Sequence, residues 1–147
     1  IGSMVAEKAH AIGMEIIAYD PNPRENSIAK FVDLNTLFAG ADIITLHVAL
    51  SEDTKNLINR ENIAKMKNGV YLINTSRGEV IDEDALYEAG KSKKIAGAAI
   101  DVYKQEPYSG KLLELDNVCF TPHLGASTKE AQLRIGKELI EKLTEAL

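Results

Sequence analysis

Short apolar runs alternate with helical patterns along most of this chain, and that alternation constrains its fold more than any other feature. The apolar runs have the length of strands and cover residues 14–19, 42–48, 70–73, 95–100 and 118–120. The segments between them carry apolar residues at helical spacing. Strands that alternate with helices favour a parallel sheet with helices on both faces. We therefore predict an α/β fold built on a doubly wound parallel sheet.

Capping residues mark where several of the helices begin. Asp33, Asn59 and Asp82 each stand directly before a helical pattern, where a side-chain oxygen can accept a hydrogen bond from a free backbone N–H. Ser127 and Glu130 have the spacing of a capping box, in which each side chain bonds the backbone of the other. This pair predicts the start of a long helix that runs to residue 147.

Size and composition exclude several classes of protein. A chain of 147 residues with 45% hydrophobic residues can bury one core, so disorder is not expected. The net charge of −5 and the absence of a basic stripe argue against nucleic acid. No apolar run is long enough to span a membrane and no signal-peptide pattern occurs, so we expect a soluble, cytoplasmic protein. The single cysteine, Cys119, excludes an internal disulfide, and its apolar neighbours predict a small core residue.

Residues that can bind or transfer charge stand where the predicted strands end. They are Asp20, His47, residues 74–77, Asp101 and His123. Ligands of open parallel sheets lie beyond the carboxyl ends of the strands. The alternative is that strands simply end where polarity begins, but this set holds two of the three histidines in the chain. We favour a ligand-binding edge, and for His47 a partly buried ring that is hydrogen-bonded to backbone.

Asp20 has a more specific role, because it lies at the end of a strand eighteen positions after Gly2. A carboxylate there can accept hydrogen bonds from the ribose hydroxyls of NAD and repel the extra phosphate of NADP. Gly2 would then be the third glycine of the fingerprint that opens a Rossmann-type sheet. A small residue for helix–strand packing explains Gly2 equally well. Under the first interpretation, the first strand and the first two glycines precede Ile1.

Three residues near the later strand ends suit acid–base chemistry on an anion. Arg77 offers a planar fork of donors that matches a carboxylate, although a surface ion pair with Glu79 or Asp82 would also explain it. His123 can donate or accept a proton near neutral pH. A carboxylate such as Glu106 beside it would favour the imidazolium form, and the alternative for Glu106 is a solvated loop acid.

Three separated motifs resemble the NAD-binding domain of the D-isomer-specific 2-hydroxyacid dehydrogenases. They are LINTSRGEVIDEDAL, AGAAIDVYKQEP and TPHLGASTKEAQ, and the resemblance covers essentially the whole chain. The HLGAST part is most similar to the D-3-phosphoglycerate dehydrogenase branch of the family. The resemblance implies reversible hydride transfer between NAD and a D-2-hydroxy acid, with 3-phosphoglycerate, a precursor in serine biosynthesis, as the first substrate to test.

The resemblance also implies roles for individual residues. Arg77 would bind the substrate carboxylate, His123 would exchange the hydroxyl proton, Glu106 would hold His123, and Asp101 would orient the nicotinamide. No metal is implied. The implied contacts to NAD come from the strand ends and the first residues, namely Ile1, Gly2, Asp20, Val48, Thr75, Ser76, Arg77, Asp101, His123, Gly125 and Ala126. Ala49 departs from the family, which usually has proline there.

Residues 1–147 would then form a partial NAD-binding domain, with the substrate-binding domain outside this chain. The resemblance implies a homodimer or tetramer formed largely through this domain, and no catalysis from the domain alone. Two alternatives stay open. One is another member of the family, such as a glyoxylate or hydroxypyruvate reductase or a D-lactate dehydrogenase. The other is a non-catalytic, NAD-sensing protein related to the corepressors of the family.

Overall fold

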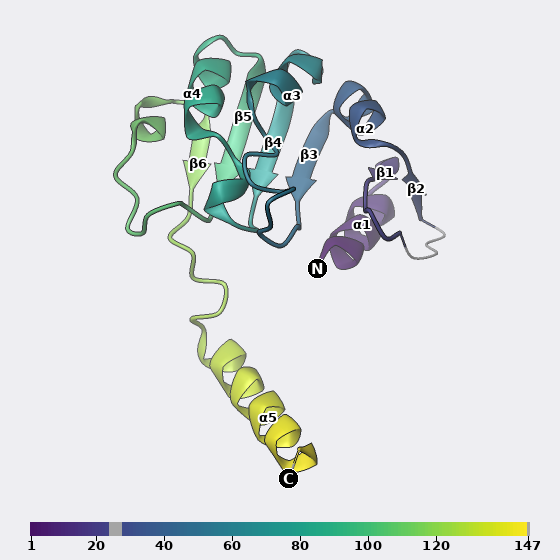
Figure 1. The fold of residues 1–147 in the computed structure, drawn as a ribbon, viewed down its shortest axis with the longest axis vertical. Helices are drawn as coiled ribbons and strands as arrows, with labels where there is room; N and C mark the ends of the chain where they lie inside the picture. Colours follow the sequence, from purple (N-terminus) through teal and green to yellow (C-terminus); the bar gives the residue numbers. More distant parts are fainter. Residues whose placement is uncertain (24–27, 147) are drawn as a thin grey trace.

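The computed structural model describes residues 1–23 and 28–146. Its main body is a sheet of four parallel strands in sequence order, β3 (Ile43–Leu46), β4 (Val70–Asn74), β5 (Ile95–Ile100) and β6 (Val118–Phe120). A second sheet pairs β1 (Ile16–Ala18) with β2 (Ala29–Phe31), also in parallel. Figure 1 shows this smaller pair beyond the β3 end of the main sheet. The predicted α/β fold with a parallel sheet is confirmed.

Helical segments connect the strands of the main sheet, as parallel pairing requires. The α-helices are α1 (Gly2–Ala11), α2 (Leu34–Gly40), α3 (Arg60–Lys65), α4 (Glu83–Lys91) and α5 (Lys129–Glu145). Two short 3₁₀ helices, η1 (Gly78–Val80) and η2 (Lys111–Glu114), lie in the connections that follow β4 and β5. None of the helices in the described ranges has both the length and the apolar character needed to cross a membrane.

The three predicted aspartate and asparagine caps are confirmed. Asp33 accepts a hydrogen bond from the backbone N–H of Thr36, and Asn59 accepts one from that of Asn62. Asp82 accepts two, from the first turn of α4. Each cap satisfies an N–H group that has no partner inside its own helix. These caps fix where the chain turns back from the carboxyl edge of the sheet.

The predicted capping box of α5 is wrong. Thr128 is the N-cap, and its hydroxyl accepts from the N–H of Ala131 at 3.1 Å. Ser127 instead closes the preceding turn, since its N–H donates to the carbonyl of Leu124. The helix therefore begins one residue later than predicted and ends at Glu145, while residue 147 lies outside the described residues.

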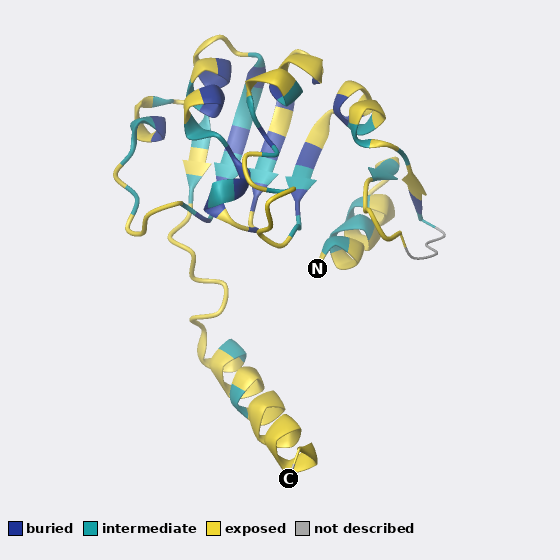
Figure 2. Cartoon of the chain, in the orientation of Figure 1, coloured by how far each residue is buried: buried dark blue, intermediate teal, exposed yellow. Residues whose placement is uncertain are grey.

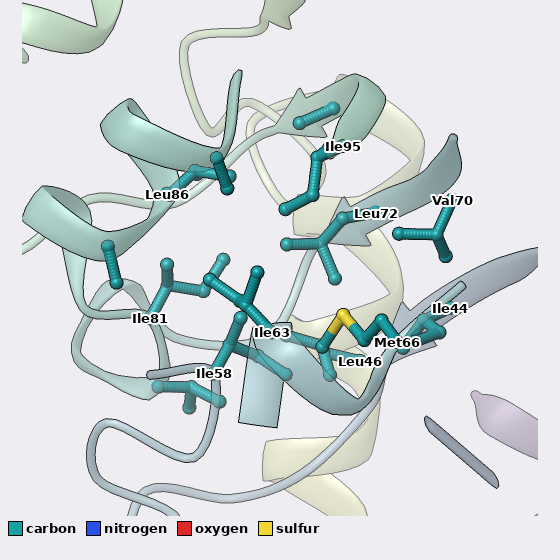
Figure 3. Close-up of a cluster of buried hydrophobic side chains, with 14 of the residues drawn as sticks. Ile44, Leu46, Ile58, Ile63, Met66, Val70, Leu72, Ile81, Leu86 and Ile95 are labelled. Carbon is teal, nitrogen blue, oxygen red and sulfur yellow. The ribbon is translucent and has the colours of Figure 1, made fainter. Parts of the chain in front are cut away.

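One hydrophobic core lies between the main sheet and helices α3 and α4 (Figure 3). Leu72, at the centre of β4, is fully buried there. Ile58 and Ile63 are both buried around the start of α3, and Ile81 and Leu86 are both buried around the start of α4. Each pair has the spacing of a hydrophobic staple, which fixes the direction in which the chain enters the helix.

Burial is uneven outside this core (Figure 2). Helices α1 and α5 contain no buried residue. The prediction that Cys119 is a core residue is wrong, because its side chain is exposed. It is the middle residue of β6, an edge strand on which residues of intermediate exposure flank an exposed one. The apolar neighbours of Cys119 face the opposite side of the strand, as alternation requires.

Candidate active site

The ends of three adjacent strands meet at one edge of the main sheet. Asn74 ends β4, Ile100 ends β5 and Phe120 ends β6, and these residues are direct partners in the strand register. The loops that follow therefore start side by side. Those loops carry the arginine, the glutamate and the histidine that the sequence identified as candidates.

The structure brings Glu106 and His123 into direct contact. Nδ1 of His123 lies 2.9 Å from Oε1 and 3.2 Å from Oε2 of Glu106. Because a carboxylate only accepts, Nδ1 carries the proton and donates it to this bond. The second ring nitrogen, Nε2, is then the one that can exchange a proton with a ligand. Both side chains are nearly half exposed, so the pair is accessible from solvent.

Asp101 fixes the backbone that carries His123. Its Oδ1 accepts a hydrogen bond from the backbone N–H of His123 at 3.1 Å and another from the hydroxyl of Thr121. His123 has a φ of 53°, in the left-handed region that non-glycine residues seldom occupy. The hydrogen bond to Asp101 therefore stabilises a backbone conformation of His123 that is unfavourable by itself. This role of Thr121 was not predicted, although a hydroxyl residue two positions before the histidine was a signal of it.

The turn that presents Arg77 is shaped by a buried asparagine. Asn74 is fully buried, and its Oδ1 accepts hydrogen bonds from the N–H and the hydroxyl of Ser76 at 3.0 and 2.8 Å. Its Nδ2 donates to the carbonyl of Arg77 at 2.9 Å. The side-chain amide of Asn74 thus provides hydrogen-bond partners for the polar groups of this turn, which a neighbouring strand would otherwise provide. Thr75, the remaining residue of the turn, is exposed.

Arg77 is an exposed residue, so its side chain can meet an anion from solvent. Its Nη1 donates to the carbonyl of Ser76 at 2.6 Å. Within the part of the chain that the structure describes, Arg77 forms no ion pair, so the alternative of a surface pair with Glu79 or Asp82 is not realised. A planar fork held at one end can still offer its other donors to a carboxylate.

Gly78 brings the arginine turn against the loop that carries Glu106. A Cβ atom added at Gly78 would lie 2.5 Å from the carbonyl oxygen of Tyr103, and closer still to the backbone of Tyr103 and Lys104. Only glycine permits such an approach of two backbones. The turn and the loop are therefore in contact, although no hydrogen bond links Arg77 to Glu106 or His123 in the described residues.

The predicted contacts for the adenosine half of NAD lie around α1 and β1. Ile1 caps α1, Gly2 starts it, and Asp20 is exposed just after β1, where its Oδ1 accepts from the N–H of Asn22 at 2.8 Å. A helix N-terminus and an exposed carboxylate suit a pyrophosphate and a ribose. A Cβ at Gly2 would lie 3.5 Å from His47, which is ordinary contact, so space does not require glycine there.

The remaining predicted contacts follow two strands of the main sheet. Val48 is partly buried after β3 and packs against the core. Gly125 and Ala126 lie in the exposed connection between β6 and α5, where the carbonyl of Ala126 accepts from the side chain of Gln132 at 2.7 Å. Within the described residues, no three His, Cys, Asp or Glu side chains are grouped so that they could hold a metal ion.

His47 bonds to a side chain instead of the predicted backbone. Its Nε2 lies 3.0 Å from the hydroxyl of Thr45. The ring is partly buried, and burial lowers its pKa below the usual 6.5. The folded protein therefore favours the neutral ring.

This shift predicts a pH dependence of stability. Because the pKa of His47 is lower in the folded state, the unfolded chain binds the proton first as the pH falls. The free energy of unfolding should therefore be insensitive to His47 above its unfolded pKa of 6.5 and decrease below it, until the pH passes the folded pKa. Urea unfolding of wild type and His47→Gln between pH 5 and pH 8 checks this. Identical pH dependence in the two proteins would contradict it.

Comparison with known proteins agrees with this geometry. Residues 1–125 match the family model described as the NAD-binding domain of the D-isomer-specific 2-hydroxyacid dehydrogenases. The chain belongs to this family. Its match to a hydroxypyruvate reductase of Thermotoga maritima is 54% identical and covers all of this chain and 50% of that protein. Its match to a D-3-phosphoglycerate dehydrogenase of Synechocystis is 48% identical and covers all of this chain and 27% of that protein.

Solved structures of this dehydrogenase family have the same fold. A D-lactate dehydrogenase of Aquifex aeolicus, crystallised with NAD and lactic acid, superposes with a TM-score of 0.88 at 36% identity. The alignment covers 98% of this chain and 49% of that one. The chain thus spans about half the length, or less, of the relatives it matches. As a member of the family it is an NAD-binding domain.

Proposed function

We propose that the protein containing this domain is an NAD-dependent oxidoreductase of D-2-hydroxy acids. The hydrogen bond between Glu106 and His123 is the observation that carries the proposal, since a histidine oriented by a carboxylate is suited to acid–base catalysis. A histidine oriented in this way favours catalysis over NAD sensing alone. The named relatives support the same reaction class.

The residues of this chain would divide the work as follows. Nε2 of His123 takes the proton of the substrate hydroxyl during oxidation and returns it during reduction. Glu106 accepts from Nδ1, holds the ring and stabilises the imidazolium that forms. Arg77 binds the substrate carboxylate and polarises the oxygen on C2. NAD, when bound, supplies the hydride acceptor.

Asp20 would select the cofactor. An exposed carboxylate at the end of β1 suits the two ribose hydroxyls of NAD and opposes the phosphate of NADP. Thr75, Ser76 and Asp101, at the ends of β4 and β5, would line the nicotinamide side. Asp101 already bonds the His123 backbone, so one carboxylate would connect cofactor placement to the acid–base residue.

The split of the sheet supports a further strand outside this chain. Among the described residues, β1 and β3 each have one edge without a strand partner. We propose that a strand upstream of Ile1 pairs at these edges and brings the first two glycines of the fingerprint. A substrate-binding domain, a homodimer or tetramer formed through this domain, and a cytoplasmic location complete the proposal.

The substrate we propose first is 3-phosphoglycerate, oxidised to 3-phosphohydroxypyruvate. The HLGAST segment and several matched relatives named D-3-phosphoglycerate dehydrogenase support it. Hydroxypyruvate is the second candidate. The relative named hydroxypyruvate reductase is more identical to this chain than the named phosphoglycerate dehydrogenases, and the chain covers a larger share of its length. The two keto acids, 3-phosphohydroxypyruvate and hydroxypyruvate, differ by a phosphate, which residues beyond this site would have to recognise.

Oxidation of NADH by the complete protein tests the proposal. We expect turnover with 3-phosphohydroxypyruvate at a kcat/KM at least about tenfold above that with hydroxypyruvate, a difference of about 1.4 kcal/mol in transition-state binding. The reverse preference would assign the second candidate. NADH binding without turnover of either substrate, or of glyoxylate and pyruvate, would favour the non-catalytic alternative and overturn the proposed activity.

A further inference from the structure

We propose that Tyr103 is a positioning residue for the proposed acid–base pair, because its hydroxyl ties together the ends of the two strands whose loops carry Glu106 and His123. This inference rests on the proposed function. No role for Tyr103 follows from its sequence pattern, in which it is one aromatic residue between Asp101 and Glu106. Its contacts in the fold carry the argument.

The hydroxyl of Tyr103 closes the hydrogen-bond ladder between β5 and β6. Its single proton is shared between the carbonyl oxygens of Ile100, at 2.9 Å, and Thr121, at 2.8 Å. The last backbone bond of the same ladder joins the N–H of Thr121 to the carbonyl of Ile100. One side chain therefore holds both strand ends at the point where their loops begin.

The same residue reaches both members of the pair. The backbone N–H of Tyr103 points at Oε1 of Glu106 at 3.4 Å, and that oxygen also accepts from Nδ1 of His123. Thr121, which the hydroxyl fixes through its carbonyl, donates its own hydroxyl to the aspartate that binds the His123 backbone. Tyr103 thus acts on Glu106 directly and on His123 through Thr121 and Asp101.

An aromatic stack holds Tyr103 in place. Its ring stacks on that of Tyr108 with centroids 4.7 Å apart, and Phe120 lies 6.4 Å away on β6. Burial and the charge of Asp101 raise the pKa of Tyr103, so the hydroxyl keeps its proton and remains a donor at neutral pH. The ring is thereby anchored, and removal of the hydroxyl should leave it where it is.

Tyr103→Phe in the complete protein tests the inference, with Tyr108→Phe as the matched control. Tyr108 belongs to the same stack, but its hydroxyl contacts Glu83 and the N–H of Leu112, outside the site. We expect Tyr103→Phe to lower kcat about 3- to 10-fold, the range of one lost hydrogen bond, with KM changed less than about twofold. Tyr108→Phe should change neither constant by more than about twofold.

A double-mutant cycle distinguishes positioning from general loss of stability. If Tyr103 acts through the pair, its substitution should change kcat less than about twofold in a Glu106→Gln background. The pH profile of kcat/KM of Tyr103→Phe should also move toward that of Glu106→Gln. An equal loss in both backgrounds, an unmoved profile, or an equal loss in Tyr108→Phe would each overturn the inference.

An NMR experiment that requires no turnover tests the role of Tyr103 independently of the proposed function. The ring resonances of His123 in histidine-labelled protein should shift in Tyr103→Phe and stay unchanged in Tyr108→Phe, while those of the exposed His10 stay unchanged in both. If no hydroxy acid is turned over, the proposed function fails and this comparison still decides the inference. Unchanged His123 resonances in Tyr103→Phe would overturn the positioning role.

Discussion

Replacement of His123 by asparagine is expected to lower kcat of the complete protein by about 10²- to 10⁴-fold, the usual contribution of a positioned acid–base group. Asparagine is the appropriate replacement because it tolerates positive φ better than other residues of its size. The backbone at φ 53° should therefore survive, and with it the bond from the residue 123 N–H to Asp101. Steady-state kinetics of NADH oxidation measure the effect.

Glu106→Gln provides the comparison for that result. A glutamine oxygen can still accept from Nδ1 of His123, but without the charge that stabilises the imidazolium. The loss in kcat should therefore be smaller than in His123→Asn, and the double variant should be little worse than His123→Asn alone, since the two residues act as a unit. Full turnover in His123→Asn would show that His123 is not the acid–base residue, and that the contact between Glu106 and His123 does not support the proposed function.

Replacement of Gly78 by alanine is expected to lower the free energy of unfolding by about 3 kcal/mol, near the upper end for overpacking. The new methyl group would meet backbone atoms of Tyr103 and Lys104, which cannot swing aside as a side chain can. The melting temperature should fall by roughly 10 °C in a domain of this size. Urea unfolding and calorimetry provide the measurement.

Gly136→Ala is the matched control for that substitution. A Cβ at Gly136, within α5, would meet nothing within 4 Å, and alanine favours a helix by about 0.5–1 kcal/mol over glycine. Gly136→Ala should therefore leave stability unchanged or raise it slightly. If Gly78→Ala were as stable as this control, the loop containing Tyr103 and Lys104 would have to move aside at little cost. The backbone contact would then not hold the turn that carries Arg77 in place.

Local signals explain what the sequence could predict. The strand at residues 70–74, the caps at Asp33, Asn59 and Asp82, and the apolar pairs around α3 and α4 each depend on residues within one turn or one strand. Polar residues at strand ends indicated which edge of the sheet to inspect. Glu106 is not at a strand end, and its pairing with His123, which the structure shows as a hydrogen bond, was implied by the family resemblance.

Contacts between distant segments account for the rest. Nothing near Gly78 in the sequence indicates that the backbone of Tyr103 lies against it. The bond from Thr121 to Asp101 crosses 20 residues, and the choice between Ser127 and Thr128 as a cap depends on the turn before α5. The exposure of Cys119 depends on which face of β6 the rest of the chain covers, which a run of three apolar letters does not reveal.

The parallel order of the strands has a consequence for how the edge assembles during folding. No two neighbouring strands of the main sheet can pair until the helix-containing segment between them has closed into a loop, and closure costs entropy before contacts repay it. Glu106 and His123, 17 residues apart, meet only after β6 has docked on β5. A chain can therefore regain its helices and much of its core while the chemistry at the edge is still unformed.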